Sequence, residues 1–305
     1  MPRPLAGVLP IVHTPFTSDD QIDRQSLKRQ IDWAFEIGAD GLGTGMVSEL
    51  LRLTRDERLS LTRDIVDLTA GRGAVFASVG AESGRAALEF ARAAEEARCD
   101  AVMALPPVTT RLPEAALLDY FRTIADSVSL PLIVQDASGY VGQAIPLSVH
   151  VALLERYGAQ KILFKPEAAP IGPNLSSLRD ATGGKARIFE GSGGILLVDS
   201  FRRGIAGTMP GMDLLDSVVH LWRALSAGDD ERAYQLYFPI CAIVALELQA
   251  GLDGFLAIEK YLLVKRGLFA NAFRRRPYGW ELDAETAHEI DRLFEMLQQA
   301  LREGK

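Results

Sequence analysis

The chain has 305 residues, with 33 Lys and Arg against 40 Asp and Glu, so its formal net charge is −7 at pH 7. This balance argues against nucleic acid as a partner, because the one dense basic run, residues 274–276, is too short to follow a duplex. A hydrophobic content of 48% with 24% charged residues is typical of a globular protein and excludes general disorder.

Membrane, disulfide and metal signals are weak throughout the sequence. No apolar run reaches the roughly 18 residues of a membrane span, and the start, MPRPLAGVLPIVHTPF, lacks the pattern of a signal peptide. We therefore expect no membrane partner and a cytoplasmic location. Cys99 and Cys241 stand far apart and the histidines are scattered singly, so we predict neither a structural disulfide nor a metal site.

Short apolar segments typical of strands alternate with longer segments typical of amphipathic helices. The helical segments, such as residues 26–39, carry apolar residues three and four positions apart. Eight parallel strands with intervening helices predict a closed (β/α)8 TIM barrel rather than an open doubly wound sheet, which more often has five or six strands. The predicted strands are residues 7–13, 40–45, 74–79, 100–105, 131–136, 161–165, 187–190 and 205–209.

The alternation stops near Asp229, and three consecutive helices are predicted over residues 231–249, 255–269 and 285–303. We therefore predict a barrel domain over residues 1–228 and a C-terminal helical extension over residues 229–305. The apolar faces of these helices need a partner, which is either the barrel wall or another subunit. A homo-oligomer is therefore expected.

Active sites of such barrels lie at the carboxyl ends of the strands, so polar residues that end an apolar strand are the first candidates. Lys165 follows an apolar run, residues 162–164, and precedes Pro166. Desolvation at this position favours the uncharged amine, which can attack a carbonyl and form a Schiff base. The alternative is a lysine whose stem lies on the barrel wall while its head reaches water or a carboxylate.

Two carboxyls are expected near this amine. Side chains alternate along a strand, so Glu167 points to the same side as Lys165, and Glu190 ends the next strand, about 4.8 Å away. An amine and two acids suit imine chemistry, which needs a nucleophile, a base for the carbon beside the imine and an acid for a leaving hydroxyl. The alternative is a structural Lys–Glu ion pair, with Glu190 as a solvated acid.

The other strand ends supply candidates for binding the substrate. Gly191 opens a Gly-Ser-Gly-Gly turn whose peptide N–H groups can hold an anion, although close backbone packing explains such a turn equally well. Residues 43–49 combine small residues with hydroxyls, which serve either as a helix cap or as donors to a carboxylate. The candidate substrate-binding residues are Thr44, Ser48, Glu49, Gln135, Asp136, Gly191 and Met209.

Several motifs together resemble the dihydrodipicolinate synthase / N-acetylneuraminate lyase family, in order and over essentially the whole chain. They are the opening GVLPIVHTPF, the block GLGTGMVSELLRLTRDER, the strand that ends in Lys165, the turn FEGSGG and the helical tail. The resemblance implies a class I lyase or aldolase on a (β/α)8 barrel, usually a tetramer, that acts on a small-molecule 2-keto acid. It also implies that Lys165 forms the imine, so that no metal or organic cofactor is needed.

The sequence departs from the family pattern at several positions. The Tyr-Asn-x-Pro motif of the fifth strand is replaced by residues 134–139, with Gln135 in place of the tyrosine that relays protons. Tyr140 stands where the synthase has a substrate-binding arginine, Val108 replaces a second tyrosine, and two residues are inserted before Glu49. Gln135 cannot donate and recover a proton as a phenol does, so a role in lysine biosynthesis is not expected.

One branch of the family, L-2-keto-3-deoxyarabonate dehydratase, is more similar. It shares VQDAS, Ser48-Glu49, the acid two residues after the lysine and the Glu-Gly pair that ends the seventh strand. In that branch the tyrosine is absent and the glutamates that match Glu167 and Glu190 are taken to transfer protons. The resemblance therefore implies dehydration of a 2-keto-3-deoxy sugar acid. A pyruvate-dependent aldolase or synthase, and a sugar-acid-binding barrel without catalysis, are the alternatives.

Overall fold

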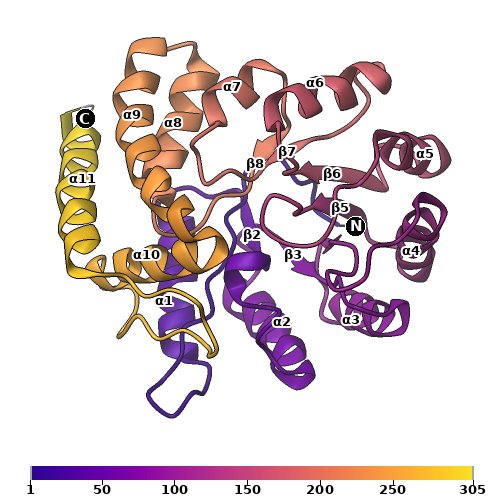
Figure 1. The fold of residues 1–305 in the computed structure, drawn as a ribbon, viewed down its shortest axis with the longest axis horizontal. Coiled ribbons are helices and arrows are strands. Elements are labelled where there is room, and N and C mark those ends of the chain that lie inside the picture. Colours follow the sequence, from indigo (N-terminus) through magenta and orange to yellow (C-terminus); the bar gives the residue numbers. More distant parts are fainter. Residues whose placement is uncertain (1, 304–305) are drawn as a thin grey trace.

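The computed structural model describes residues 2–303 as a central ring of strands with helices outside it (Figure 1). The strands are β1 (Gly7–Val8), β2 (Gly41–Gly43), β3 (Ala74–Ser78), β4 (Ala101–Ala104), β5 (Leu132–Asp136), β6 (Ile162–Pro166), β7 (Phe189–Glu190) and β8 (Gly207–Thr208). The surrounding helices are α1 (Arg24–Glu36), α2 (Arg55–Thr69), α3 (Gly84–Glu96), α4 (Glu114–Ser127), α5 (Leu147–Tyr157), α6 (Ile171–Ala181), α7 (Leu197–Arg202) and α8 (Leu215–Ala227). The predicted TIM barrel with a C-terminal helical extension is confirmed.

The strands are all parallel and follow one another in chain order around the ring. One sheet has the order β2-β3-β4-β5-β6 and the other the order β1-β8-β7. Isolated parallel bridges, Ile11 with Gly43 and Phe164 with Ile188, join the two sheets at both seams. The carboxyl ends of the strands therefore meet at one end of the barrel, where active sites of this fold lie.

Apolar side chains fill two layers, and strand alternation decides which layer each residue joins. Along β6, Leu163 lies in the cluster inside the barrel, whereas Ile162 and Phe164 lie in the larger cluster under the helices. At β7, Phe189 points inward while Ile188, directly before the strand, points outward. The same alternation continues into the polar strand ends and decides which of them face the barrel axis.

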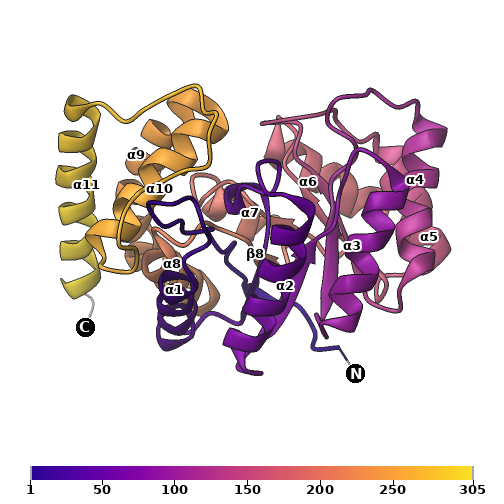
Figure 2. The ribbon, with the colours of Figure 1, turned by 90° about the horizontal axis from the view of Figure 1, so that it is seen from below.

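Three helices follow the barrel, namely α9 (Asp230–Glu247), α10 (Gly251–Lys265) and α11 (Ala284–Glu303). Figures 1 and 2 show α11 at the outer edge of the molecule, and α9 packs between it and α8. Residues 230–265 are long and apolar enough to span a membrane by length and composition alone, but here they pack on neighbouring helices. α10 reaches the barrel mouth, where it contacts the 3₁₀ turn η1 (Met46–Ser48). The domain division at residue 228 stays a prediction.

A buried ion pair fastens α10 to the barrel. Lys260 Nζ pairs with Glu49 and also donates to the carbonyl oxygens of Thr14 and Phe273, each at 2.8 Å. Glu49 accepts a further hydrogen bond from the peptide N–H of Arg275 at 2.8 Å. Both charged side chains are fully buried, and burial lowers the pKa of Lys260 to about 8. The pair therefore ties η1, α10 and the segment after α10 together.

We predict that Lys260→Met lowers the free energy of unfolding by about 3–5 kcal/mol, because it leaves Glu49 buried without its cation. The matched control is Lys28→Met, which removes a lysine that is 59% exposed and pairs with Asp32 on α1. That change is expected to lower the free energy by less than about 1 kcal/mol. Urea unfolding of the two variants measures both effects, and equal losses would contradict the structural role of the buried pair.

Candidate active site

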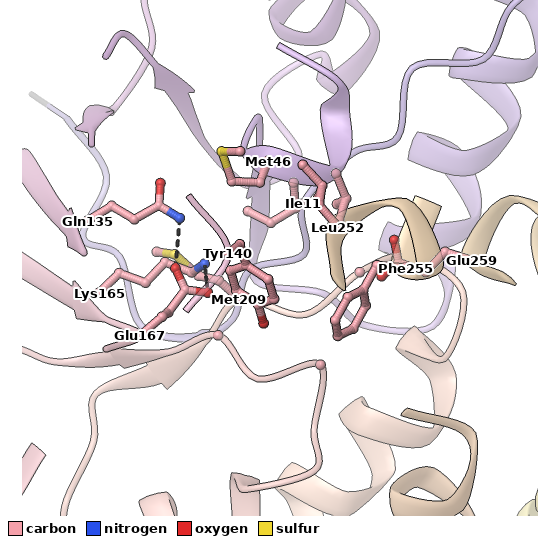
Figure 3. A pocket seen from close by; sticks show the side chains of 14 residues that line it. Ile11, Met46, Gln135, Tyr140, Lys165, Glu167, Met209, Leu252, Phe255 and Glu259 are labelled. Atoms are coloured by element: carbon pink, nitrogen blue, oxygen red, sulfur yellow. Dashed lines mark hydrogen bonds and ion pairs between the residues drawn. The ribbon is translucent and has the colours of Figure 1, made fainter. Parts of the chain in front are cut away.

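A cavity opens at the carboxyl ends of the strands, between the barrel and α10 (Figure 3). Its apolar wall includes Ile11, Met46, Met209, Leu252 and Phe255. The polar side chains that reach it are Gln135, Tyr140, Lys165, Glu167 and Glu259. An apolar pocket with few convergent polar groups is the usual form of a small-molecule site.

Three of these polar groups form one chain of contacts. Lys165 Nζ lies 2.8 Å from Glu167 Oε1, and Gln135 Nε2 donates to Glu167 Oε2 at 2.7 Å. Gln135 on β5 is the register partner of Lys165 on β6, so both side chains leave the barrel wall at the same level. The peptide N–H of Glu167 donates to the carbonyl of Asp136, which extends the ladder past the end of β6 and keeps Glu167 on the inner face.

The surroundings of Glu167 favour the protonated form of its carboxyl. Burial raises the pKa of the Glu167 carboxyl above its ordinary value of 4.5, and the negative charge of Glu190 adds to this shift. The Lys165 ammonium and the hydrogen bond from Gln135 act in the opposite direction. A carboxyl whose pKa is raised while it touches an amine is well placed both to take and to return a proton.

Gly191 makes room for this arrangement. A Cβ at position 191 would lie 2.5 Å from Lys165 Cε, 2.6 Å from its Nζ and 2.5 Å from Glu167 Oε1. Gly191 and Gly193 both line the cavity, so the glycine turn after β7 forms part of its wall. Any side chain at residue 191 would have to displace the amine or its carboxyl.

Glu190 is buried next to this site but points away from the cavity. Because Phe189 points inward, alternation turns Glu190 toward the outer layer, where Thr208 of β8 is its register partner. The Thr208 hydroxyl donates to one carboxylate oxygen at 2.8 Å, and the peptide N–H of Ser192 donates to the other at 2.5 Å. Glu190 therefore acts on Glu167 through its charge, while Glu167 alone of the two touches the amine.

Four predicted substrate-binding residues also lie outside the cavity. Thr44 accepts a hydrogen bond from the peptide N–H of Ser78, and Ser48 donates to the carbonyl of Val12. Asp136 points outward from β5 and accepts from the peptide N–H groups of residues 138 and 145. Glu49 is the partner of Lys260, as described above. These side chains hold loops around the cavity, whereas Gln135, Gly191 and Met209 line it.

The cavity also contains residues that the sequence analysis did not select as candidates. Tyr140 comes from the loop after β5, and its ring packs edge-on against Phe255 of α10 at 5.7 Å between centroids. Burial raises the pKa of the Tyr140 phenol above its usual range, so it stays protonated. Glu259, one helical turn after Phe255, was visible in sequence as a charge inside the apolar stretch 255–264.

Comparison with known proteins places this geometry in context. The sequence matches the dihydrodipicolinate synthetase family over residues 4–297. It is 29% identical to L-2-keto-3-deoxyarabonate dehydratase of Azospirillum brasilense over 93% of this chain and 92% of that one. The structure is similar to dihydrodipicolinate synthase from Rhodopseudomonas palustris, with a TM-score of 0.84, 26% identity and coverage of 96% and 98% of the two chains. It is also similar in fold to the Escherichia coli prophage protein YagE in complex with pyruvate, with a TM-score of 0.86, 23% identity and coverage of 96% and 98%.

We predict that Gly191→Ala slows covalent trapping of pyruvate by borohydride at least about 100-fold, because its methyl group displaces the Lys165 amine. The matched control is Gly84→Ala on α3, where an added Cβ meets nothing within 4 Å. That variant should trap pyruvate at the wild-type rate. Mass spectrometry of the reduced protein measures both rates, and normal trapping by Gly191→Ala would contradict the crowded geometry.

Proposed function

Because this chain belongs to the dihydrodipicolinate synthetase family of lysine-imine lyases, we propose that it dehydrates a 2-keto-3-deoxy sugar acid, such as 2-keto-3-deoxyarabonate. The observation that carries the proposal is the buried contact of the Lys165 amine with the Glu167 carboxyl. The side chain beside them on β5 is Gln135, an amide that positions Glu167 but transfers no proton itself. Glu167 is therefore the one group beside the amine that we expect to transfer protons.

The reaction begins when the Lys165 amine attacks the C2 ketone of the substrate. The resulting carbinolamine loses its hydroxyl as water and becomes a protonated imine, with Glu167 as the group that exchanges protons. The positive imine nitrogen draws electrons from C2 and makes the C3 hydrogens acidic. The imine is therefore the electron sink of the reaction, and the proposed chemistry needs no added cofactor.

The elimination step follows from the contact of Glu167 with the amine. Ionised Glu167 takes a proton from C3, and the C3–H electron pair moves to form the enamine. The enamine then expels the C4 hydroxyl, which leaves as water after receiving a proton, and a double bond forms between C3 and C4. Hydrolysis of the imine releases the product and restores the amine. Because Glu190 faces away from the cavity, we assign the proton for the leaving hydroxyl to Glu167 and a supporting electrostatic role to Glu190.

The substrate carboxylate is assigned to the glycine turn after β7. Gly191 and Gly193 both line the cavity beside Lys165, and peptide N–H groups in such turns bind anions. The apolar residues Ile11 and Met209 pack against the carbon chain. The tetramer that the sequence resemblance implies, and the cytoplasmic location expected from the sequence pattern, are proposals of the same kind.

Product analysis tests the reaction itself. Wild-type protein with 2-keto-3-deoxyarabonate should give a product lighter by one water and should release no pyruvate, whereas Lys165→Ala should give neither product nor a borohydride adduct. Release of pyruvate would instead identify an aldolase, an alternative supported by the similarity to YagE, which is named a putative 2-dehydro-3-deoxy-D-gluconate aldolase. Wild-type protein that forms no adduct with any 2-keto acid would refute the imine mechanism.

We predict different pH profiles for variants of the two glutamates. The acid limb of kcat/KM should follow Glu167, because the rate falls as pH drops through its raised pKa and the base becomes protonated. Glu190→Gln removes a charge that raises this pKa, so the limb should move to lower pH. An unchanged acid limb in Glu190→Gln would show that Glu190 does not act through Glu167.

Glu167→Gln should lower kcat by about 10²–10⁴ while the borohydride adduct still forms.

A further inference from the structure

A second carboxyl faces the cavity from the C-terminal extension. Figure 3 shows Glu259 beside Phe255, on the side of the cavity opposite Lys165 and Glu167. Its Oε2 atom lies 2.7 Å from His13 Nε2, and its Oε1 atom borders Gly211, another lining residue. The cavity therefore has polar groups at both ends and an apolar wall between them.

Three more buried titratable side chains lie near Glu259. His13, Asp213 and Glu247 are 0%, 3% and 1% exposed, respectively. His13 Nδ1 has no hydrogen-bond partner among residues 2–303, and Asp213 Oδ2 and Glu247 Oε1 lack one while both carboxyls are ionised. Once one of the two carboxyls is protonated, Glu247 and Asp213 can hydrogen-bond to each other. Burial of unpartnered polar atoms is costly, so packing alone does not account for this cluster.

The cations near the cluster are bound elsewhere. Lys260, next to Glu259 on α10, pairs with Glu49, and Arg266 at the end of α10 pairs with Asp216 and the carbonyl of Asp213. No group of three or more His, Cys, Asp or Glu side chains within residues 2–303 is arranged to hold a metal ion. The cluster therefore has to limit its negative charge by keeping protons.

The titration of the cluster agrees with this conclusion. Burial raises the pKa of Asp213 to about 7, with a further contribution from Glu259, and burial also raises the pKa values of Glu247 and Glu259. Burial lowers the pKa of His13 to about 4, so its ring is neutral at pH 7. Neutral imidazole and proton-holding carboxyls form a network that can both donate and accept hydrogen bonds at little net charge.

We propose that Glu259 binds a hydroxyl group on the substrate carbons beyond C4, and that His13 positions the Glu259 carboxyl for this contact. The inference rests on the proposed function, because the ketone has to be anchored on Lys165 at the opposite end of the cavity. A hydroxyl both donates and accepts, which matches a carboxyl that shares a proton with an imidazole. A substrate that ends in a methyl group would leave the Oε1 atom of this buried carboxyl without a partner, while Oε2 keeps its contact with His13.

The substrate class that follows is a 2-keto-3-deoxy acid with a hydroxyl at C5 or beyond. A matched pair of substrates isolates this contact, namely 2-keto-4,5-dihydroxypentanoate and 2-keto-4-hydroxypentanoate, which share the ketone and the C4 leaving group. Wild-type protein should dehydrate the dihydroxy acid with a kcat/KM at least about tenfold higher, mainly through a lower KM. A ratio near one would overturn the inference.

Substitutions at residue 259 assign the preference to its side chain. Glu259→Met should reduce the ratio to near one, whereas Glu259→Gln keeps a donor and an acceptor and should retain most of it. The matched control is Glu155→Met on the exposed face of α5, which should leave the ratio unchanged. A wild-type ratio in Glu259→Met would overturn the assignment.

The failure of this inference can be told apart from the failure of the proposed function. If wild-type protein forms no borohydride adduct with either acid, both the proposed imine mechanism and this inference are refuted. If adducts form with both acids but the ratio is near one, only the role of Glu259 is refuted. The wild-type ratio needs no substitution, so a variant that does not fold leaves the test intact.

Discussion

A buried lysine amine held against a buried carboxyl is the interaction on which the rest of this site depends. Lys165 and Glu167 are 4% and 5% exposed and lie 2.8 Å apart. Burial of such a pair gives up hydration that the contact only partly restores, so the pair is poor evidence of a stabilising role. Gln135 fixes the carboxyl from the neighbouring strand and Gly191 leaves the space for it, so both neighbours hold the geometry that the proposed reaction needs.

The eight-strand barrel and the shared face of Lys165 and Glu167 follow from simple periodicity, which is why sequence reasoning reached them. The same alternation explains why Glu190, Asp136 and Thr44 point away from the cavity. Phe189, next to Glu190, belongs to the inner layer, whereas Val134 and Leu42, two residues before Asp136 and Thr44, belong to the outer layer. Position at a strand end was therefore too weak a criterion by itself. Combined with the direction of the apolar neighbour, it separates side chains that face the barrel axis from those that face the helices.

Other parts of the site depend on contacts that no local pattern contains. Glu49 pairs with Lys260, which lies 211 residues away in the sequence. Because of this pair, the Glu49 side chain, a candidate for binding the substrate, instead holds α10 against the barrel. The phenol of Tyr140 faces Phe255 because a loop and a helix meet over the barrel mouth. One local signal did exist, because Glu259 and Lys260 interrupt an apolar helix, and charges are rarely buried without a partner or a function.

The division of labour between barrel and extension has a physical basis. The proposed reacting groups, Lys165 and Glu167, stand on and directly after β6, where the ladder to β5 fixes the backbone to the precision that proton transfer needs. The remote end of the cavity is formed largely by α10, whose side chains can change without disturbing the strand register. A family that keeps the strands and varies this helix can retain imine chemistry while it changes substrates. Similarity to both a synthase and a dehydratase is the pattern that such a construction produces.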